Sequence, residues 1–244
     1  MRIAILSDVH ANIEALAEVE RTIAERAVDQ VACLGDVVGY GASPNQCCDI
    51  LRRMASVALL GNHDAAVSGR MDYAFYYDAA RQALDWTARN LRPDNLAWLG
   101  SLPYTHRIGE VGFSHGSPIR PEAYDYILAS EQAADLLPFV DQLPAVTFIG
   151  HSHLTKVFAL QGGSEVVEVS GRKFRLRPGY KYIVTVGAVG HPRDYDNRAC
   201  FVIHDTEERT VEYVRVPYDI ESSAQRIFDA KVAVNFGRRL FLGV

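Results

Sequence analysis

Cysteine and long apolar runs are both scarce in this 244-residue chain. No stretch reaches the roughly 18 uninterrupted apolar residues expected of a membrane span, and Met1-Arg2-Ile3 leads directly into a strand pattern instead of a signal peptide. These absences predict a cytoplasmic protein without a membrane segment. The four cysteines lack C-x-x-C spacing, and two are adjacent, so we expect unpaired, mostly buried thiols at Cys33, Cys47, Cys48 and Cys200.

An excess of basic charge is also missing. The chain has 25 lysines and arginines against 30 aspartates and glutamates, a formal net charge of -5. With no basic cluster and no recognition-helix signature, this balance argues against specific nucleic-acid binding, but it leaves room for a small basic pocket around one phosphorylated ligand. No repeat or low-complexity linker divides the sequence, so we predict a single domain over residues 1–244.

The first 60 residues alternate between apolar runs and helical periodicity. Strands are expected over Ile3–Leu6, Val31–Leu34 and Val57–Leu60, and helices over residues 11–28 and Gln46–Met54, the second opened by Pro44. Strand and helix in this alternation build a parallel sheet.

Residues 71–100 differ because aromatic side chains are dense there. Their spacing predicts two or three helices packed as a layer over the sheet, since aromatic side chains at helical spacing usually form core. The alternative is a lid over a functional site. Two further short strands are expected over Val111–Phe113 and Val146–Ile149.

From about residue 156 to residue 217 the pattern becomes strands separated by turns. We predict that these strands form a second, largely antiparallel sheet. A helix is then expected over Tyr218–Ala230, and a second helix over residues 231–244. The sequence pattern does not identify the element against which this second helix packs. The expected strands are Glu165–Ser170, Lys173–Leu176, Tyr182–Val186, Cys200–His204 and Thr210–Val216.

Five short polar blocks stand at or just after runs that are typical of buried strands. Because ligands gather at the carboxyl ends of the strands in open α/β sheets, we expect the blocks to meet. The blocks are Ser7-Asp8-Val9-His10, Gly35-Asp36-Val37-Val38-Gly39, Gly61-Asn62-His63-Asp64, Ser114-His115-Gly116 and Gly150-His151-Ser152-His153.

The blocks supply the nitrogen and oxygen ligands that borderline divalent metals bind. Asp8 and His10 are two residues apart in a segment leaving a strand, so extended geometry would project both to one side; His151 and His153 repeat this arrangement. Two ions about 3.5–4 Å apart fit best if one carboxylate is shared. Asp36 is the natural bridge. The predicted ligands are Asp8, His10, Asp36, Asn62, His115, His151 and His153.

The order of these blocks resembles that of the calcineurin-like metallophosphoesterases, whose motifs run D-x-H, G-D-x-x, G-N-H-D/E, a later histidine and G-H-x-H. The match spans residues 8–153. The resemblance implies an α/β fold, a four-layer α/β/β/α sandwich of two mixed sheets flanked by helices. It also implies that one metal is bound by Asp8, His10 and His153, that the other is bound by Asn62, His115 and His151, and that Asp36 bridges them.

By the same resemblance, His63 contacts the phosphate and donates a proton to the leaving group, a role that suits the titration range of imidazole. In the protein phosphatases of the family the second motif continues as G-D-x-x-D-R-G, and its second aspartate supports this histidine. Here Gly39-Tyr40 stands in place of Asp-Arg, and Asp64 is the candidate substitute. The chain instead resembles the small stand-alone prokaryotic phosphoesterases.

Residues 35–45 and 186–194 carry that second resemblance, and they suggest a substrate rim of Asn12, Tyr40, Gly190 and Arg193. Arg193 or Arg198 could hold a second phosphate. Each of these residues could instead have a structural role: Asn12 can cap a helix, glycines are common in turns, and arginines are often solvated. His191 stays open, whereas His106 and His204 are expected to be structural.

These observations predict a dinuclear metal-dependent phosphoesterase that cleaves a small phosphorylated substrate by attack of a metal-bound hydroxide. Absence of the protein-phosphatase arginine favours phosphodiesters or small nucleotides. The alternatives are a phosphomonoesterase or phosphoprotein phosphatase, a dinucleoside polyphosphate hydrolase, or a non-catalytic metal-binding scaffold. The ligand set suits two divalent ions drawn from manganese, iron, zinc, nickel and cobalt.

Overall fold

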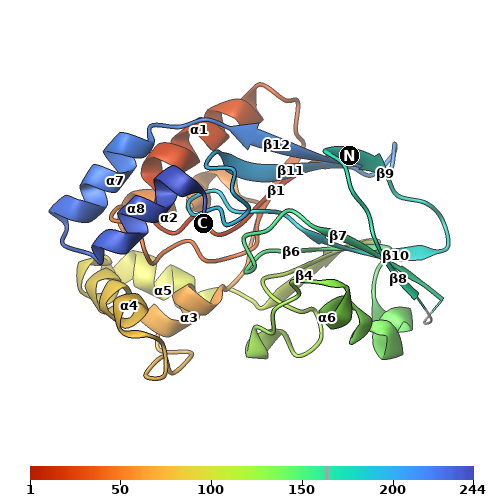
Figure 1. Cartoon of the computed structure of the whole chain (residues 1–244), viewed down its shortest axis with the longest axis horizontal. Helices are drawn as coiled ribbons and strands as arrows, with labels where there is room; N and C mark the ends of the chain where they lie inside the picture. The colour runs from red at the N-terminus through yellow and green to blue at the C-terminus, as the bar shows by residue number, and fades with distance from the viewer. Residues whose placement is uncertain (163–164) are drawn as a thin grey trace.

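The computed structural model describes residues 1–162 and 165–244, in which two six-stranded sheets pack face to face (Figure 1). The strands of the first sheet are β1 (Arg2–Leu6), β2 (Gln30–Cys33), β3 (Val57–Ala58), β9 (Lys173–Arg175), β11 (Ala199–Asp205) and β12 (Thr210–Val216). Those of the second sheet are β4 (Thr105–Ile108), β5 (Val111–Ser114), β6 (Val146–Ile149), β7 (Val157–Gln161), β8 (Glu165–Glu168) and β10 (Tyr180–Thr185).

Helices cover the outer face of each sheet. Next to the first sheet lie α1 (Ile13–Ala24), α2 (Pro44–Met54) and α7 (Ile220–Asp229), with α3 (Asn62–Val67), α4 (Asp78–Asn90), α5 (Pro93–Ser101) and α8 (Val234–Leu242) beyond the strand ends. The second sheet is covered by α6 (Ser130–Ala134) and the short helices η1 (Pro121–Ala123) and η2 (Leu137–Gln142). This layering confirms the predicted four-layer sandwich of two mixed sheets.

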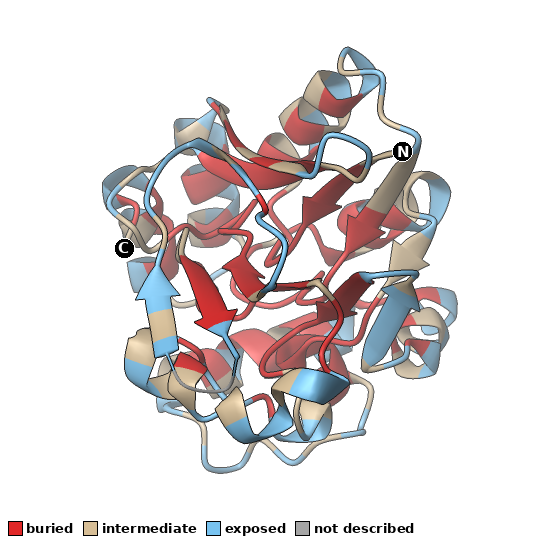
Figure 2. Ribbon diagram, turned by 90° about the vertical axis from the view of Figure 1, so that its right-hand side faces the viewer, coloured by how far each residue is buried: buried red, intermediate tan, exposed pale blue. Residues whose placement is uncertain are grey.

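Strand β1 shows why the apolar runs are continuous. Ile3 and Ile5 face the second sheet, whereas Ala4 and Leu6 face the helices, because successive side chains of a strand point to opposite faces. Both faces are covered, so neither set can be polar. Figure 2 shows the result, with buried strands in both sheets and exposed residues mainly in the peripheral segments.

The predicted division of strands between the sheets is wrong. The first sheet has the order β3-β2-β1-β11-β12-β9, and the second has the order β4-β5-β6-β10-β7-β8. The strands after residue 156 therefore do not form a sheet of their own. They extend both sheets, with β11 antiparallel to β1 and β10 parallel to β6. Strand periodicity identifies a strand, but it carries no information on the partner strand.

Several element boundaries are narrower than predicted. The first helix begins after Asn12, whose side chain caps it, and ends at Ala24. The aromatic-rich segment contains α4 and α5, whose Leu84 and Leu99 join the core, as expected of a helical layer. Helix α8 packs beside α7, which supplies the partner that the sequence pattern did not identify.

All four cysteines are buried and unpaired, as predicted. Among the described helices, none combines the length and apolar character that crossing a membrane requires.

Candidate active site

Loops that follow five strands converge at one edge of the sandwich. Hydrogen bonds between their backbones join them: the His10 amide donates to the Asp36 carbonyl (2.9 Å), and the Gly150 amide donates to the His115 carbonyl (2.8 Å). Close approach requires glycine, since a Cβ on Gly61 would lie 2.1 Å from the Asp36 nitrogen. The polar blocks therefore meet, as their positions after strands predict.

The backbone in these loops is not extended, which corrects the predicted geometry. Of the thirteen non-glycine residues with positive φ in the described part of the chain, seven lie here, and five of those are predicted ligands. Such conformations cost of order 1–3 kcal/mol each and cluster at functional sites. The seven are Asp8, His10, Ala11, Asp36, Tyr40, His151 and His153.

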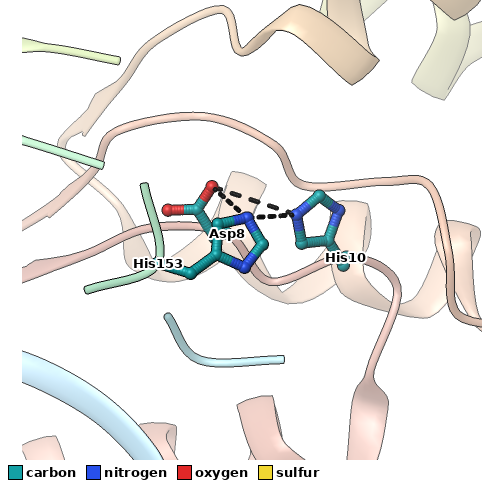
Figure 3. Close-up of side chains that lie close together, drawn as sticks. All are labelled: Asp8, His10 and His153. Atoms are coloured by element: carbon teal, nitrogen blue, oxygen red, sulfur yellow. Dashed lines mark hydrogen bonds and ion pairs between the residues drawn. The ribbon is translucent and has the colours of Figure 1, made fainter. Parts of the chain in front are cut away.

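A first cluster consists of Asp8, His10 and His153, whose side chains converge (Figure 3). The Nε2 atoms of the two histidines are 3.2 Å apart, and Asp8 Oδ1 lies 3.3 Å from His153 Nε2. Each histidine directs Nδ1 at a backbone carbonyl, of Val38 and of His191 respectively. A carbonyl only accepts, so in the neutral rings the proton is on Nδ1 and two Nε2 lone pairs face each other.

A second cluster consists of Asp36, His115 and His151. His115 Nδ1 donates to the Leu34 carbonyl (2.9 Å), so its Nε2 is the acceptor in the neutral ring. That Nε2 lies 3.1 Å from Asn62 Oδ1 and 3.5 Å from Asp36 Oδ2. With His115 neutral, three acceptors again point at one another. Burial lowers the pKa of His115, but the Asp36 charge outweighs it and raises the pKa to about 9, so a proton occupies this Nε2 at pH 7 unless a cation displaces it. His151 and His153 thus belong to different clusters, although the sequence suggested that they project together.

The two aspartates divide their oxygens in the same way. Asp8 Oδ2 accepts the His151 amide (3.0 Å), and Asp36 Oδ1 accepts the His63 amide (2.9 Å). Asp8 Oδ1 is buried and has no hydrogen-bond partner among the described residues. Asp36 Oδ2 lies 3.6 Å from His10 Nε2 and 3.5 Å from His115 Nε2. One carboxylate oxygen of Asp36 is therefore situated between the clusters.

The pKa shifts describe a site built for cations. Burial lowers the pKa values of His10, His151 and His153 well below the ordinary imidazole value, so their lone pairs are free at neutral pH. Burial also raises the pKa of Asp8 to about 7, with the Asp36 charge adding to the effect. Facing lone pairs and a buried, unpaired carboxylate oxygen fit divalent metals, because a cation satisfies all of these acceptors together.

His63 lies beside both clusters, and its Nδ1 has no hydrogen-bond partner within the described residues. The ring meets the Tyr40 ring edge-on at a centroid distance of 4.5 Å, and burial lowers the pKa of His63 to about 4. Asp64 does not support this imidazole: its carboxylate accepts the backbone amides of Gly61, Val37 and Val38. The proposed substitution of Asp64 for the protein-phosphatase aspartate is therefore wrong.

A cavity of about 510 Å³ opens above the clusters. Its lining includes His63, Tyr40 and Arg193, and the Arg193 Nη2 lies 3.5 Å from the Tyr40 hydroxyl. Arg193 Nε is buried and without a hydrogen-bond partner in the described chain. Arg198 instead pairs with Asp196 and is absent from the described lining. Of the two arginines considered, only Arg193 faces the cavity.

Other candidate residues have structural contacts. The Asn12 amide nitrogen donates to the Gly190 carbonyl (3.0 Å), and its oxygen caps α1. Neither residue belongs to the described cavity lining. The His191 carbonyl accepts from the metal-cluster residue His153. His106 is exposed on β4, and His204 Nδ1, on β11, donates to the Thr210 carbonyl (3.0 Å).

Most aromatic residues of the cavity were missed in sequence: those before α4 were assigned to a core layer, Tyr124 and Tyr126 were not considered, and only Tyr40 was predicted at the rim. The lining includes Met71 and Ala80 with six aromatic rings, and Tyr76 accepts a hydrogen bond from Asn62 Nδ2 (2.8 Å). Thus α4 and α5 form the predicted layer, while the segment before α4 reaches the site. The density of aromatic residues at 73–77 was the available signal. The six are Tyr40, Phe75, Tyr76, Tyr77, Tyr124 and Tyr126.

Comparison with known proteins agrees with the geometry. A family model described as calcineurin-like phosphoesterase matches residues 1–188. An uncharacterised protein of Methanocaldococcus jannaschii is 35% identical over 245 residues, covering 99% of this chain and 98% of its own. The crystal structure of a metallophosphoesterase from Sphaerobacter thermophilus is 34% identical, with a TM-score of 0.85 and coverage of 100% and 99%. A hypothetical protein from Pyrococcus horikoshii, 19% identical, shares the fold with a TM-score of 0.80 and coverage of 100% and 98%.

Proposed function

Since the chain belongs to the calcineurin-like phosphoesterase family, whose members are metal-dependent phosphoric ester hydrolases, we propose that it binds two divalent ions and hydrolyses phosphodiesters or small nucleotides. The first ion is assigned to Asp8, His10 and His153, and the second to Asn62, His115 and His151. Asp36 contacts both.

The position of Asp36 Oδ2 carries the proposal. This oxygen lies 3.6 Å from a histidine nitrogen of the first cluster and 3.5 Å from one of the second. A single ion would serve only one cluster and would leave the ligand atoms of the other without a cation. Two ions would serve both clusters, with the Asp36 carboxylate shared between them.

The bound ions would supply Lewis acidity toward the phosphoryl oxygens and would activate the attacking water. The chain itself contributes charge and a proton. Arg193 lines the cavity, so its guanidinium can bind a phosphate oxygen there. Tyr40 packs against both His10 and His63 and so holds these rings in place.

His63 is assigned the proton transfer to the leaving oxygen. Burial lowers its pKa to about 4, so the ring is neutral at pH 7 when the cavity holds no anion. An anionic phosphate beside the ring raises the pKa, because opposite charge favours the protonated form. In its protonated form the ring can donate to the departing alkoxide.

Cavity dimensions favour a small substrate. About 510 Å³ is within the range of roughly 300–1,000 Å³ typical of small-molecule sites, and the aromatic lining surrounds the clusters. An extended phosphoprotein surface would need a shallower approach. Manganese, iron, zinc, nickel and cobalt all suit the ligand set, so the ion is to be identified by reconstitution.

A reconstitution screen tests the proposal. The metal-free protein is loaded in turn with each ion and assayed on p-nitrophenyl phosphate, its bis ester, cyclic nucleotides and diadenosine tetraphosphate. We expect the bis ester or a nucleotide to be hydrolysed with the highest kcat/KM. Preference for the monoester would contradict the substrate assignment. Bound metal without turnover of any ester would favour the non-catalytic scaffold.

A further inference from the structure

Three aromatic side chains of the cavity are unusually exposed. Phe75 is 76% exposed, Tyr77 is 54% exposed and Tyr126 is 46% exposed, although each lines the cavity above the clusters. Large apolar side chains left in solvent around a concave site are typical of ligand contacts. We call these three residues the aromatic mouth.

The ring of Tyr126 is held in a defined plane. One face stacks on the His151 imidazole at a centroid distance of 3.8 Å and an angle of 16°. Its loop is fixed by Tyr124, which is buried, has a positive φ of 54° and directs its hydroxyl at the Gly61 carbonyl (3.3 Å). Because His151 covers one face, the exposed area of Tyr126 belongs to the remainder of the ring.

Phe75 and Tyr77 are also held by their neighbours. Tyr76, between them, accepts the hydrogen bond from Asn62, and Arg81 donates to the Ala74 carbonyl (2.9 Å). Phe75 meets the Tyr76 ring edge-on at 5.3 Å. The exposed rings therefore belong to a segment tied to the metal end of the cavity.

Most charged groups of the cavity lining lie beside the clusters. Arg193 and the histidines mark where a phosphate belongs, and the one carboxylate of the lining next to the mouth, Asp125, is paired with Arg120 (2.9 Å). The three rings of the aromatic mouth are themselves uncharged. The ligand that matches has an anionic phosphate at one end and a flat, uncharged aromatic group at the other. We propose that Phe75, Tyr77 and Tyr126 form a nucleobase-binding subsite, so that the substrate is a nucleoside phosphate ester. This inference rests on the proposed function.

The test compares two diesters with the same leaving group, the p-nitrophenyl ester of thymidine 5′-monophosphate and methyl p-nitrophenyl phosphate. Wild-type protein loaded with manganese should prefer the thymidine ester. Tyr126→Leu and Phe75→Leu should each lower the ratio of kcat/KM values by about tenfold or more, as the loss of base stacking predicts. Among the described ring contacts, Phe75 meets Tyr76 and none of the proposed ligands, so its effect is separate from any disturbance of His151.

Tyr195→Leu is the matched control, because Tyr195 is 86% exposed and is absent from the described cavity lining. It should leave the ratio unchanged. Equal kcat/KM values for the two esters in the wild type, or an unchanged ratio in both mouth variants, would overturn the subsite while leaving the phosphoesterase proposal intact.

If neither ester is hydrolysed, the proposed function fails and the subsite is tested by binding. Titration of the manganese-loaded protein with adenosine 5′-monophosphate and with ribose 5-phosphate then decides. Tighter binding of the adenosine compound, reduced about tenfold or more by Phe75→Leu, supports the subsite. Equal affinities overturn it.

Discussion

The floor of the cavity and its aromatic mouth are built in opposite ways. At the floor, Asp8, Asp36 and the cluster histidines are almost fully buried. Both aspartates and three of these histidines have one side-chain polar atom hydrogen-bonded to the backbone, while another atom faces the cluster. At the mouth, Phe75, Tyr77 and Tyr126 are exposed and lack charge. The floor is specified by short motifs and determines the reaction. The mouth is specified by tertiary position, and we infer that it determines the substrate.

Asp36→Asn should have the largest effect, because Asp36 is the residue that both clusters share. The amide can still accept the His63 backbone N–H, but it loses the charge between the ions. We expect metal content to fall below two ions per chain and kcat/KM to fall by about a thousandfold or more, as loss of several kcal/mol of charge stabilisation implies. Elemental analysis measures the metal content, and an ester assay measures kcat/KM.

Asp141→Asn, at an exposed position on η2, is the control for Asp36→Asn and should change neither quantity. Unchanged metal content in Asp36→Asn would refute the bridging role.

His63→Ala separates chemistry from metal binding. Loss of the proton donor should reduce kcat by about 10²–10⁴-fold while two ions remain bound. His106→Ala, at an exposed position on β4, should change neither. Loss of one metal in His63→Ala would instead make His63 a ligand, which is compatible with its grouping near His10 and Asp36.

Tyr76→Phe tests the connection between mouth and floor. The Tyr76 hydroxyl accepts from Asn62 Nδ2 and so turns Asn62 Oδ1 toward His115. Without it the amide can rotate, and affinity for the second ion should fall about 10–100-fold, the usual cost of losing a partner that orients a ligand. Calorimetric titration with manganese measures each site. Tyr73→Phe, which removes a hydroxyl bonded to Asp85, should leave both affinities unchanged.

Metal binding should release protons at neutral pH. Burial lowers the pKa of His115, but the Asp36 charge outweighs it and raises the pKa to about 9, so metal-free protein holds this proton at pH 7. An ion at the second cluster must displace it. Affinity should therefore increase between pH 7 and pH 9, by up to about tenfold per pH unit for one proton, and then level off. Titrations in buffers of different ionisation enthalpy count the protons, and zero release at pH 7 would contradict the assignment.

Asn12→Ala should have the smallest effect on activity. Loss of the α1 cap should lower the free energy of unfolding by about 1 kcal/mol, or Tm by about 2–4 °C, with kcat/KM almost unchanged. Thermal melts and the ester assay distinguish a role of Asn12 as a helix cap from a role in substrate binding. A large rise in KM with an unchanged Tm would restore Asn12 to the substrate rim.

The floor was predictable because strand ends of an α/β sheet meet, and so Asp8, Asp36 and His115 could be grouped from sequence. Their backbone conformations could not, since the positive φ values at Asp8 and His153 arise from contacts between loops distant in sequence. The exposure of Phe75 was also beyond prediction, because aromatic spacing is the same for a core helix and for a cavity wall. The prediction of strand partners failed for a similar reason. Strand β11 pairs with β1, although almost the whole chain separates them in sequence.

Anomalous diffraction from crystals of the manganese-loaded protein tests the dinuclear centre most directly. We expect two peaks about 3.5–4 Å apart, with Asp36 Oδ2 bound between them, His10 and His153 on one ion, and His115 and His151 on the other. A single peak, or two peaks of which only one contacts Asp36, would contradict it.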